Sequence, residues 1–377
     1  MSSTITLLFS GDFAPLVKRE EITDKHFADL QSLFQNIDSH ITNLESPLTN
    51  AGKLIEKTGP AIKSIPEAVN LLKQAKVNIA CMANNHIFDY GEEGLFDTME
   101  VCQKNGIETL GIVNGSAQGE GYLVKTIKGK KIGFVNVCEH EFSVRDEGLP
   151  GAKGYDPVDA FYMLNGLKQK TDYVIVVYHG GNEYYPLPSP ALRKTFQYLV
   201  DIGADAVIGH HTHVMSGYEY YNNKPLVYSL GNFFFPEKDE HPRWYEGLLC
   251  ELKLEEAKLD LAFTPVLHDP DTLQNWVIRD NRSKEIFKHL EQLNTIIVNE
   301  QQLKQEWNKF VHKKGEALTR LFLLNTRVQK LFNKFAFTRK ILFKALKIKK
   351  RKALLFNLIR CQALNEIIRD SLKKPKQ

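Results

Sequence analysis

The sequence predicts a layered α/β domain followed by a helical extension, on three observations. Short apolar runs rich in β-branched and aromatic residues alternate with amphipathic stretches of helical length, as in layered α/β folds. Several of these runs end in polar residues of metal-binding type. From about Thr272 onward glycine and proline become scarce, which favours helix over the rest of the chain.

The individual elements follow from the length and composition of each segment. Five apolar runs are too short for core helices and are predicted as strands, over residues 5–9, 41–44, 77–82, 173–178 and 206–208. The amphipathic stretches predict helices over residues 24–36, 66–76, 92–105, 157–168 and 190–202. Further strands that could complete the sheets are predicted over residues 121–127, 131–137, 228–235 and 247–254.

The polar residues that end the first five strands form the main functional signal. They occur in the segments Gly11-Asp12, Asn43-Leu44-Glu45, Asn84-Asn85-His86, His179-Gly180-Gly181 and Gly209-His210-His211-Thr212-His213. Ligands of open α/β sheets bind beyond the carboxyl ends of the strands. We therefore expect these side chains to converge on one rim.

The residue types in these segments indicate a transition-metal site. Mixed carboxylate, amide and imidazole ligands suit Mn, Fe, Zn or Ni better than an all-oxygen calcium site. The set is too large for one tetrahedral ion. Two divalent ions about 3.5–4 Å apart, bridged by a carboxylate, would use all of it and would suit attack by water on a phosphoryl centre. We therefore expect one or two divalent ions and an anionic phosphoester or polymer substrate.

The order of these motifs over about residues 5–250 resembles that of the calcineurin-like metallophosphoesterase superfamily. More narrowly, the chain is similar to the CapA-type capsule (poly-γ-glutamate) synthesis proteins. The similarity lies in Asn-Leu-Glu-Ser-Pro-Leu-Thr (43–49), Ala-Asn-Asn-His-x-x-Asp-Tyr-Gly (83–91), His-x-Gly-x-Glu-Tyr (179–184) and Tyr-Ser-Leu-Gly-Asn-Phe (228–233). This resemblance implies a four-layer α/β/β/α sandwich of mixed sheets, whereas the periodicity alone indicates only α/β.

The resemblance also implies roles for individual residues. Asp12 and His213 would bind the first metal, and Glu45 would bridge both metals. The second metal would take the remaining ligands of the set, namely Asn85, His179 and His211. His210 falls at the position that the family lets vary.

The same resemblance implies an acid group that needs no metal contact. His86 matches the general acid of the superfamily, and Asp89 could fix its tautomer. One motif departs from the superfamily pattern, Asp-x-His, because Asp12 is followed by Phe13 and Ala14. The first metal therefore lacks the imidazole that this motif supplies in the superfamily, although CapA-like proteins share this feature.

Two residues near the motifs are candidates for substrate contact. Glu183 could bond substrate, orient His179 or lie on the surface near the mouth of the site. Lys57 belongs to a lysine-containing segment, 53–63, that could hold an anionic substrate or form an ordinary solvated loop.

Cysteine usage and hydropathy set the expected compartment. The five cysteines are scattered and odd in number, which indicates reduced, buried thiols. The N-terminus runs into the first motif without the pattern of a signal peptide, and no run of 18 apolar residues follows. We expect a cytoplasmic protein, with possible peripheral contact at the inner face of the membrane.

Charge divides the chain. Residues 313–377 hold 19 Lys and Arg against 3 Asp and Glu, a net charge of +16, whereas residues 1–312 hold 30 against 42, a net charge of −12. We expect a metallophosphoesterase-like domain over residues 1–270 and a helical extension over 271–377 that is strongly basic from 313. Its apolar and basic pattern suits an anionic membrane, an acidic partner such as a capsule-synthesis complex, or the acidic core itself. No recognition module accompanies the charge, so nucleic acid is not expected.

Two functions are compatible with these observations. The first is a metal-dependent, phosphoesterase-like hydrolase that acts in capsule or surface-polymer biosynthesis. The second is a non-catalytic metal-binding assembly factor or polymer-binding factor of a capsule-synthesis complex. The fold alone does not decide between them, because function depends on the site and not on the fold.

Overall fold

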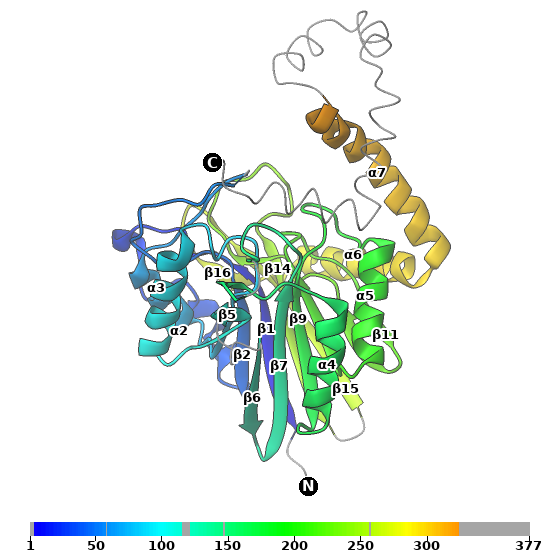
Figure 1. Cartoon of the computed structure of the whole chain (residues 1–377), viewed down its shortest axis with the longest axis horizontal. Coiled ribbons are helices and arrows are strands. Elements are labelled where there is room, and N and C mark those ends of the chain that lie inside the picture. The colour runs from blue at the N-terminus through cyan, green and yellow to red at the C-terminus, as the bar shows by residue number, and fades with distance from the viewer. Residues whose placement is uncertain (1–3, 58, 115–120, 146–147, 256–257, 324–377) are drawn as a thin grey trace, which may run out of the picture. The chain divides into compact units, whose positions relative to one another are not determined.

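The structure is a computed structural model that describes residues 4–57, 59–114, 121–145, 148–255 and 258–323. Residues Met1–Leu303 form one compact unit and Lys304–Gln377 a second. The first unit holds two large mixed sheets and the helices that cover them (Figure 1).

The first sheet contains eight strands and is parallel on one side and antiparallel on the other. Its parallel strands are β1 (Ile5–Phe13), β2 (Ser39–Leu44), β3 (Ile79–Cys81) and β4 (Glu108–Leu110), and β13 (Asn232–Phe234) also pairs in parallel with β1. Its antiparallel strands are β14 (Glu246–Glu255), β15 (Lys258–His268) and β16 (Asn275–Val277). The long strand β15 and the short β16 were not predicted from the sequence.

The second sheet has the order β11-β12-β10-β9-β7-β6. Its strands are β6 (Tyr122–Ile127), β7 (Lys130–Cys138), β9 (Tyr173–His179), β10 (Ala206–His210), β11 (Tyr218–Tyr221) and β12 (Lys224–Val227). A separate pair is formed by β5 (Ile112–Asn114) and β8 (Pro150–Ala152). Strands β7, β9, β10 and β12 run parallel, so their carboxyl ends lie at one edge.

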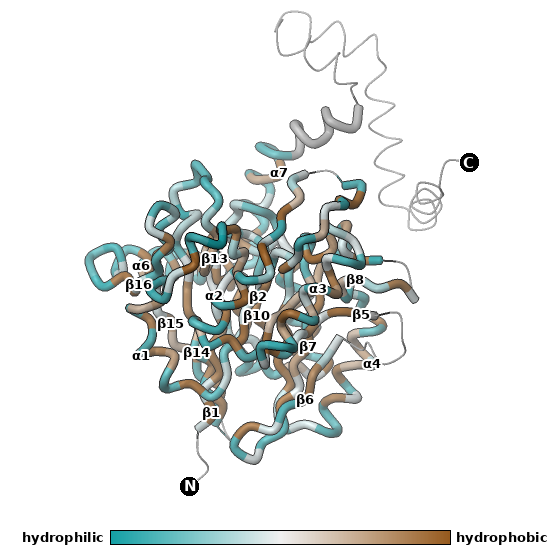
Figure 2. Tube along the Cα trace, turned by 90° about the vertical axis from the view of Figure 1, so that its left-hand side faces the viewer, coloured by the Kyte–Doolittle hydropathy of each residue, from teal (hydrophilic) through white to brown (hydrophobic). Residues whose placement is uncertain are grey.

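Alternating side chains of β1 show why the sheets stack face to face. Leu7 and Phe9 are buried in the cluster that also contains Phe134 and Ile175 of the second sheet, whereas Leu8 is buried in a cluster on the opposite face. This period of two places one apolar face toward each layer. Figure 2 shows hydrophobic residues concentrated along these strands. The expected four-layer sandwich of mixed sheets is confirmed.

Helices form the outer layers. The first sheet is covered by the one-turn α1 (Gln31–Phe34), α2 (Val69–Gln74) and α3 (Gly91–Lys104), with 3-10 turns at Arg19–Glu21, Ala28–Leu30 and Pro66–Ala68. The second sheet is covered by α4 (Pro157–Lys168) and α5 (Pro190–Asp201), which lie side by side. Ser189 caps α5, because its hydroxyl accepts a hydrogen bond from the Leu192 amide at 3.0 Å.

The single helix predicted over residues 24–36 is wrong. Only a 3-10 turn and the one-turn α1 form there. The carbonyl of His26, which a helix would use internally, instead accepts a hydrogen bond from the Asn275 amide at 2.7 Å. The carboxylate of Asp29 likewise accepts one from the Val277 amide at 2.9 Å. Pairing with β16 therefore replaces helical bonds in this segment.

The compact unit extends beyond the boundary expected at residue 270. Strand β16 pairs with β15, and α6 (Asn281–Val298) contacts β11. In that contact the Tyr218 amide donates to the side-chain oxygen of Asn294 at 2.7 Å. Helix α7 (Glu300–Leu323) follows, and most of the basic stretch from residue 313 lies outside the described residues.

Four of the five cysteines lie in the described residues. Cys81, Cys102, Cys138 and Cys250 are free and buried, as expected, and Cys361 lies outside the described residues. Among the described helices, none combines the length and the apolar character that a membrane span requires.

Candidate metal centre

The carboxyl ends of β1, β2, β9 and β10 bring the predicted ligands together. Asp12 lies beside Asn43 of β2 and Asn232 of β13, at a shift in register between Ser10 and Asp12. Such a bulge turns a side chain out of the regular alternation of the strand. His210, the last residue of β10, pairs with His179, the last residue of β9.

Glycines beside two of these strand ends permit close approach of the backbone. A Cβ atom on Gly11 would lie 2.0 Å from the Gly231 carbonyl oxygen, and one on Gly209 would lie 2.3 Å from the Tyr228 carbonyl oxygen. Any larger residue would push these segments apart. The glycines therefore help to place Asp12 and the histidine-rich turn.

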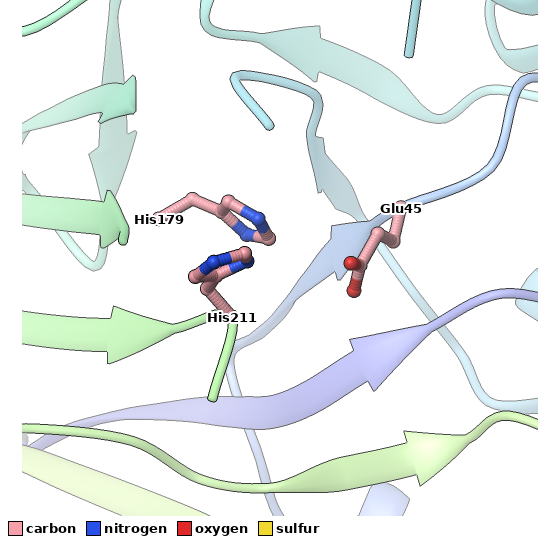
Figure 3. Close-up of side chains that lie close together, drawn as sticks. All are labelled: Glu45, His179 and His211. Atoms are coloured by element: carbon pink, nitrogen blue, oxygen red, sulfur yellow. The ribbon is translucent and has the colours of Figure 1, made fainter. Parts of the chain in front are cut away.

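Two groups of ligand-type side chains share one carboxylate. The first group consists of Glu45, His179 and His211, and the second group consists of Asp12, Glu45 and His213. Within each group the ligand atoms lie within 4.8 Å of one another. Figure 3 shows the two imidazoles of the first group facing the Glu45 carboxylate. This is the arrangement expected for a carboxylate that bridges two ions.

The first group also contains the kind of unpaired atoms that an ion would satisfy. The buried atoms Oε1 of Glu45, Nδ1 of His179 and Nδ1 of His211 have no hydrogen-bond partner among the described residues. Nε2 of His179 lies 3.0 Å from Oδ1 of Asn85. The two predicted ligands Asn85 and His179 are therefore in contact. The residues therefore fit a divalent transition metal.

The second group is similarly close-set. Nδ1 of His213 lies 3.4 Å from Oδ2 of Asp12, and Nε2 lies 3.6 Å from Oε1 of Glu45. Nδ1 of His213 also lies 3.0 Å from Oδ1 of Asn232. Metal-binding histidines commonly donate their second nitrogen to an oxygen, which fixes the ring orientation. Asn232 would thus direct Nε2 of His213 toward Glu45.

Amides around the two groups hold the carboxylates, and sequence reasoning assigned them no role. Nδ2 of Asn43 donates to Oδ1 of Asp12 at 2.8 Å and to Oε2 of Glu45 at 3.4 Å. Nδ2 of Asn84 donates to the Leu44 carbonyl at 2.8 Å. Both asparagines stand in the motifs next to the predicted ligands, and that position is the signal that could have identified them.

His210 was left without a role in the sequence analysis, yet it lies in the site. It is buried, and its Nδ1 lies 3.2 Å from Oδ1 of Asp12. It belongs to neither ligand group. This contact helps to orient the Asp12 carboxylate.

The predicted acid and its partner are in contact. Nδ1 of His86 lies 2.7 Å from Oδ2 of Asp89, which is fully buried. The second oxygen of Asp89 accepts a hydrogen bond from Nζ of Lys57 at 2.5 Å. The Lys57 side chain is only 6% exposed, so it is largely covered by the protein where it pairs with Asp89.

A cleft opens beside the two groups. It encloses about 240 Å³ and is lined in part by His86, Glu183, Tyr184, His213 and Trp244. Glu183 is exposed and forms a third ligand-type group with His211 and His213. The structure therefore places Glu183 at the mouth of the site.

Apolar packing occupies the side of Asp12 where the superfamily motif has a histidine. Ala14 is fully buried in a cluster with Ile62, Phe235 and Trp244. The ring centroids of His213 and Trp244 lie 4.8 Å apart, so this cluster also packs against a predicted ligand. The missing imidazole is thus replaced by a hydrophobic wall.

Burial and nearby charges shift the pKa values of Glu45 and Asp12 in opposite directions. Burial raises the pKa of Glu45 well above its usual range, and the charge of Asp12 raises it further. Burial would also raise the pKa of Asp12, but hydrogen bonds with His210 and His213 outweigh burial and hold this pKa well below the usual range. One of two adjacent carboxyls therefore tends to keep its proton in the absence of a cation.

The three imidazoles also differ in the direction of their pKa shifts. Burial lowers the pKa of His179 well below its usual range, and burial and the neighbouring His213 lower that of His211 to about 3. Burial opposes the charged form of His213 too, but Glu45 and Asp12 raise its pKa to about 10. His179 and His211 are therefore neutral and ready to bind an ion, whereas His213 must first lose a proton.

Three residues at this rim have backbone angles that are uncommon outside glycine. His211, His213 and Tyr184 have φ angles of +95°, +57° and +62°, in a region that non-glycine residues rarely adopt. Such residues persist where the surrounding structure holds them, and they cluster at functional sites.

Comparisons with known proteins relate the chain to bacterial capsule synthesis proteins. The family model described as "Bacterial capsule synthesis protein PGA_cap" matches residues 6–237. The chain is 32% identical over 183 residues to the PGA biosynthesis protein CapA of Bacillus subtilis, covering 45% of this chain and 46% of the relative. It is 27% identical over 177 residues to the capsule biosynthesis protein CapA of Bacillus anthracis, covering 45% and 43%.

The chain thus spans about half the length of the curated relatives it matches. Among solved structures, a hypothetical protein from Thermus thermophilus aligns with a TM-score of 0.46 at 18% identity, over 73% of this chain and 100% of that chain.

Proposed function

Because the chain belongs to the bacterial capsule synthesis protein PGA_cap family, we propose that it is a metal-dependent, phosphoesterase-like hydrolase that acts in capsule or surface-polymer biosynthesis. The sharing of Glu45 by two ligand groups is the observation that carries this proposal. Two divalent ions bound there would polarise a phosphoryl group and promote attack by water.

The chain's own residues would then handle the proton of the leaving group. With Nδ1 of His86 committed to Asp89, Nε2 is the nitrogen free to donate a proton. His86 lines the same cleft as His213, so an acid and a ligand face one space. Asn43 and His210 both contact Oδ1 of Asp12, and the His211 amide donates to Oδ2, which together limit the rotation of this carboxylate.

A non-catalytic role is the second candidate, and one observation favours it. The ion of the second group has Asp12, Glu45 and His213 as its ligand-type residues in the described chain, because Ala14 packs in an apolar cluster. Weakly held metal would reduce turnover but would still allow binding of an anionic polymer. In this role the chain would serve a capsule-synthesis complex as a metal-binding assembly or polymer-binding factor.

The two candidates are separated by a substrate panel on metal-loaded protein. Purified chain, reconstituted with Mn²⁺ or Zn²⁺, is assayed against a phosphomonoester, a phosphodiester and poly-γ-glutamate. Hydrolysis of a phosphoester that is lost in His86→Ala, with metal content unchanged, supports the hydrolase. Metal binding without turnover of any phosphoester contradicts it and favours the binding factor.

The basic extension adds a proposal about location. We infer that residues beyond 313 bring the protein to anionic lipid at the inner face of the membrane, on the basis of their net charge of +16. An acidic partner in a capsule-synthesis complex would satisfy the same charge. These residues lie mostly outside the described part of the chain, so the proposal depends on sequence alone.

A further inference from the structure

The segment after β9 carries Glu183 on a fixed support. The backbone amide of the next residue, Tyr184, donates to the Thr212 carbonyl at 2.8 Å, which joins this segment to the histidine-rich turn. The Tyr184 hydroxyl donates to Oδ2 of Asp239 at 2.8 Å, and its ring stacks on Trp244 with centroids 5.8 Å apart. Although Glu183 is exposed, its backbone is therefore held over the metal centre.

His211 and His213 each have more than two carboxylates nearby, since Oε1 of Glu141 lies 3.9 Å from Nε2 of His211 and Oδ2 of Asp12 lies 3.4 Å from Nδ1 of His213. Each belongs to a ligand-type group with the buried Glu45, and both belong to the group that contains Glu183. Nδ1 of His211 is buried without a hydrogen-bond partner in the described chain. A cation placed here would satisfy groups that the protein alone leaves unpaired.

The group of Asp12, Glu45 and His213 offers three protein residues to a transition metal ion, the number typical of sites that keep further coordination positions open. Such ions take four or more ligands in proteins. Ala14 lies two residues after Asp12 and packs with Phe235 and Trp244. The protein therefore offers no metal donor from the Ala14 side chain. Glu183 shares a ligand-type group with His211 and His213 and lines the cleft at the mouth of the site.

We propose that Glu183 is a further ligand of the ion held by Asp12, Glu45 and His213. This inference rests on the proposed metal centre. The carboxylate brings a fourth protein residue to that ion and offsets part of its charge. Because Glu183 is the exposed member of the set, it is also the ligand that an incoming anionic substrate can displace without opening the core.

Co²⁺ titration of the full-length chain tests this proposal, followed by absorption spectroscopy and calorimetry. The variant Glu183→Gln keeps the size of the side chain and removes its charge. Glu237→Gln is the matched control, since Glu237 is exposed in the same cleft but belongs to no ligand-type group among the described residues. Wild type and control are expected to bind two equivalents with the same affinities and spectra.

In Glu183→Gln the affinity for one Co²⁺ ion should fall by at least about 10-fold and the d–d absorption of that ion should change. The affinity for the other Co²⁺ ion should stay unchanged. Glu183→Ala should show the same loss, and unfolding in EDTA checks that both variants fold. Two unchanged affinities in both Glu183 variants would overturn the proposal and leave the metal centre intact. Absence of Co²⁺ binding by the wild type would instead overturn the metal centre itself, and the Glu183 proposal with it.

Discussion

Metal binding to the second ligand group is predicted to release protons and to strengthen as the pH rises. Burial would lower the pKa of His213, but Glu45 and Asp12 outweigh it and raise that pKa to about 10. The pKa of Glu45 is also raised, by burial and by Asp12. At neutral pH the metal-free site therefore holds at least one proton that an ion must displace.

The size of the effect follows from the pKa of His213. Removing a proton with a pKa of about 10 at pH 7 costs about 4 kcal/mol, since each pKa unit corresponds to about 1.4 kcal/mol. Apparent affinity should thus rise about 10-fold per pH unit above neutrality, until the pH reaches the pKa. In the metal-free protein the sign is reversed: because the folded pKa lies above the ordinary 6.5, the stabilisation from His213 is complete below pH 6.5 and is lost as the pH rises through about 10.

Calorimetry with Mn²⁺ between pH 6.5 and 8.5, in pairs of buffers with different protonation enthalpies, measures the proton release directly. We expect binding of the ion by the second group to release at least one proton. His213→Gln is the matched variant and should release fewer protons while binding that ion more weakly. An affinity that does not change with pH, together with no proton release, would refute the reasoning from the Asp12, Glu45 and His213 geometry.

Three further predictions concern separate parts of the chain. His179→Ala or His211→Ala should remove at least one equivalent of bound metal, because both belong to the Glu45 group, and mass-spectrometric metal analysis of a folded variant with full metal content would count against the assignment. His86→Ala should keep its metal and lose about 10²–10⁴-fold in turnover of a hydrolysed phosphoester, because its contact is with Asp89, and a parallel loss of metal would make it a ligand instead. Full-length protein should co-sediment with phosphatidylserine or cardiolipin vesicles at low salt and detach at high salt, whereas a chain ending near Asn308 should keep its metals and not sediment; binding that ignores salt and truncation would exclude the lipid proposal.

The sequence alone was sufficient to predict the strands whose ends carry polar ligands. Their apolar runs are short and uniform, and β1, β2, β9 and β10 begin within a few residues of the expected positions. Strand β15 was missed because much of it is only half-buried, so its apolar pattern is weak. The helix expected around Phe27 fails because contacts with β16, a segment far along the chain, compete with local helical bonds.

The candidate ligands were also accessible to sequence reasoning, since residue type and position at a strand end are local properties. The surrounding contacts were not. That His210 bonds Asp12, and that Lys57 reaches Asp89, depends on how distant segments fold together. The apolar cluster at Ala14 likewise needs Trp244, which is remote in sequence.

The central claim is that Glu45 bridges two ions, and anomalous scattering from crystals grown with Mn²⁺ tests it most directly. The account predicts two anomalous peaks about 3.5–4 Å apart, with the Glu45 carboxylate between them, His179 and His211 beside one peak, and Asp12 and His213 beside the other. A single peak, or no peak within coordination distance of Glu45, would contradict the claim.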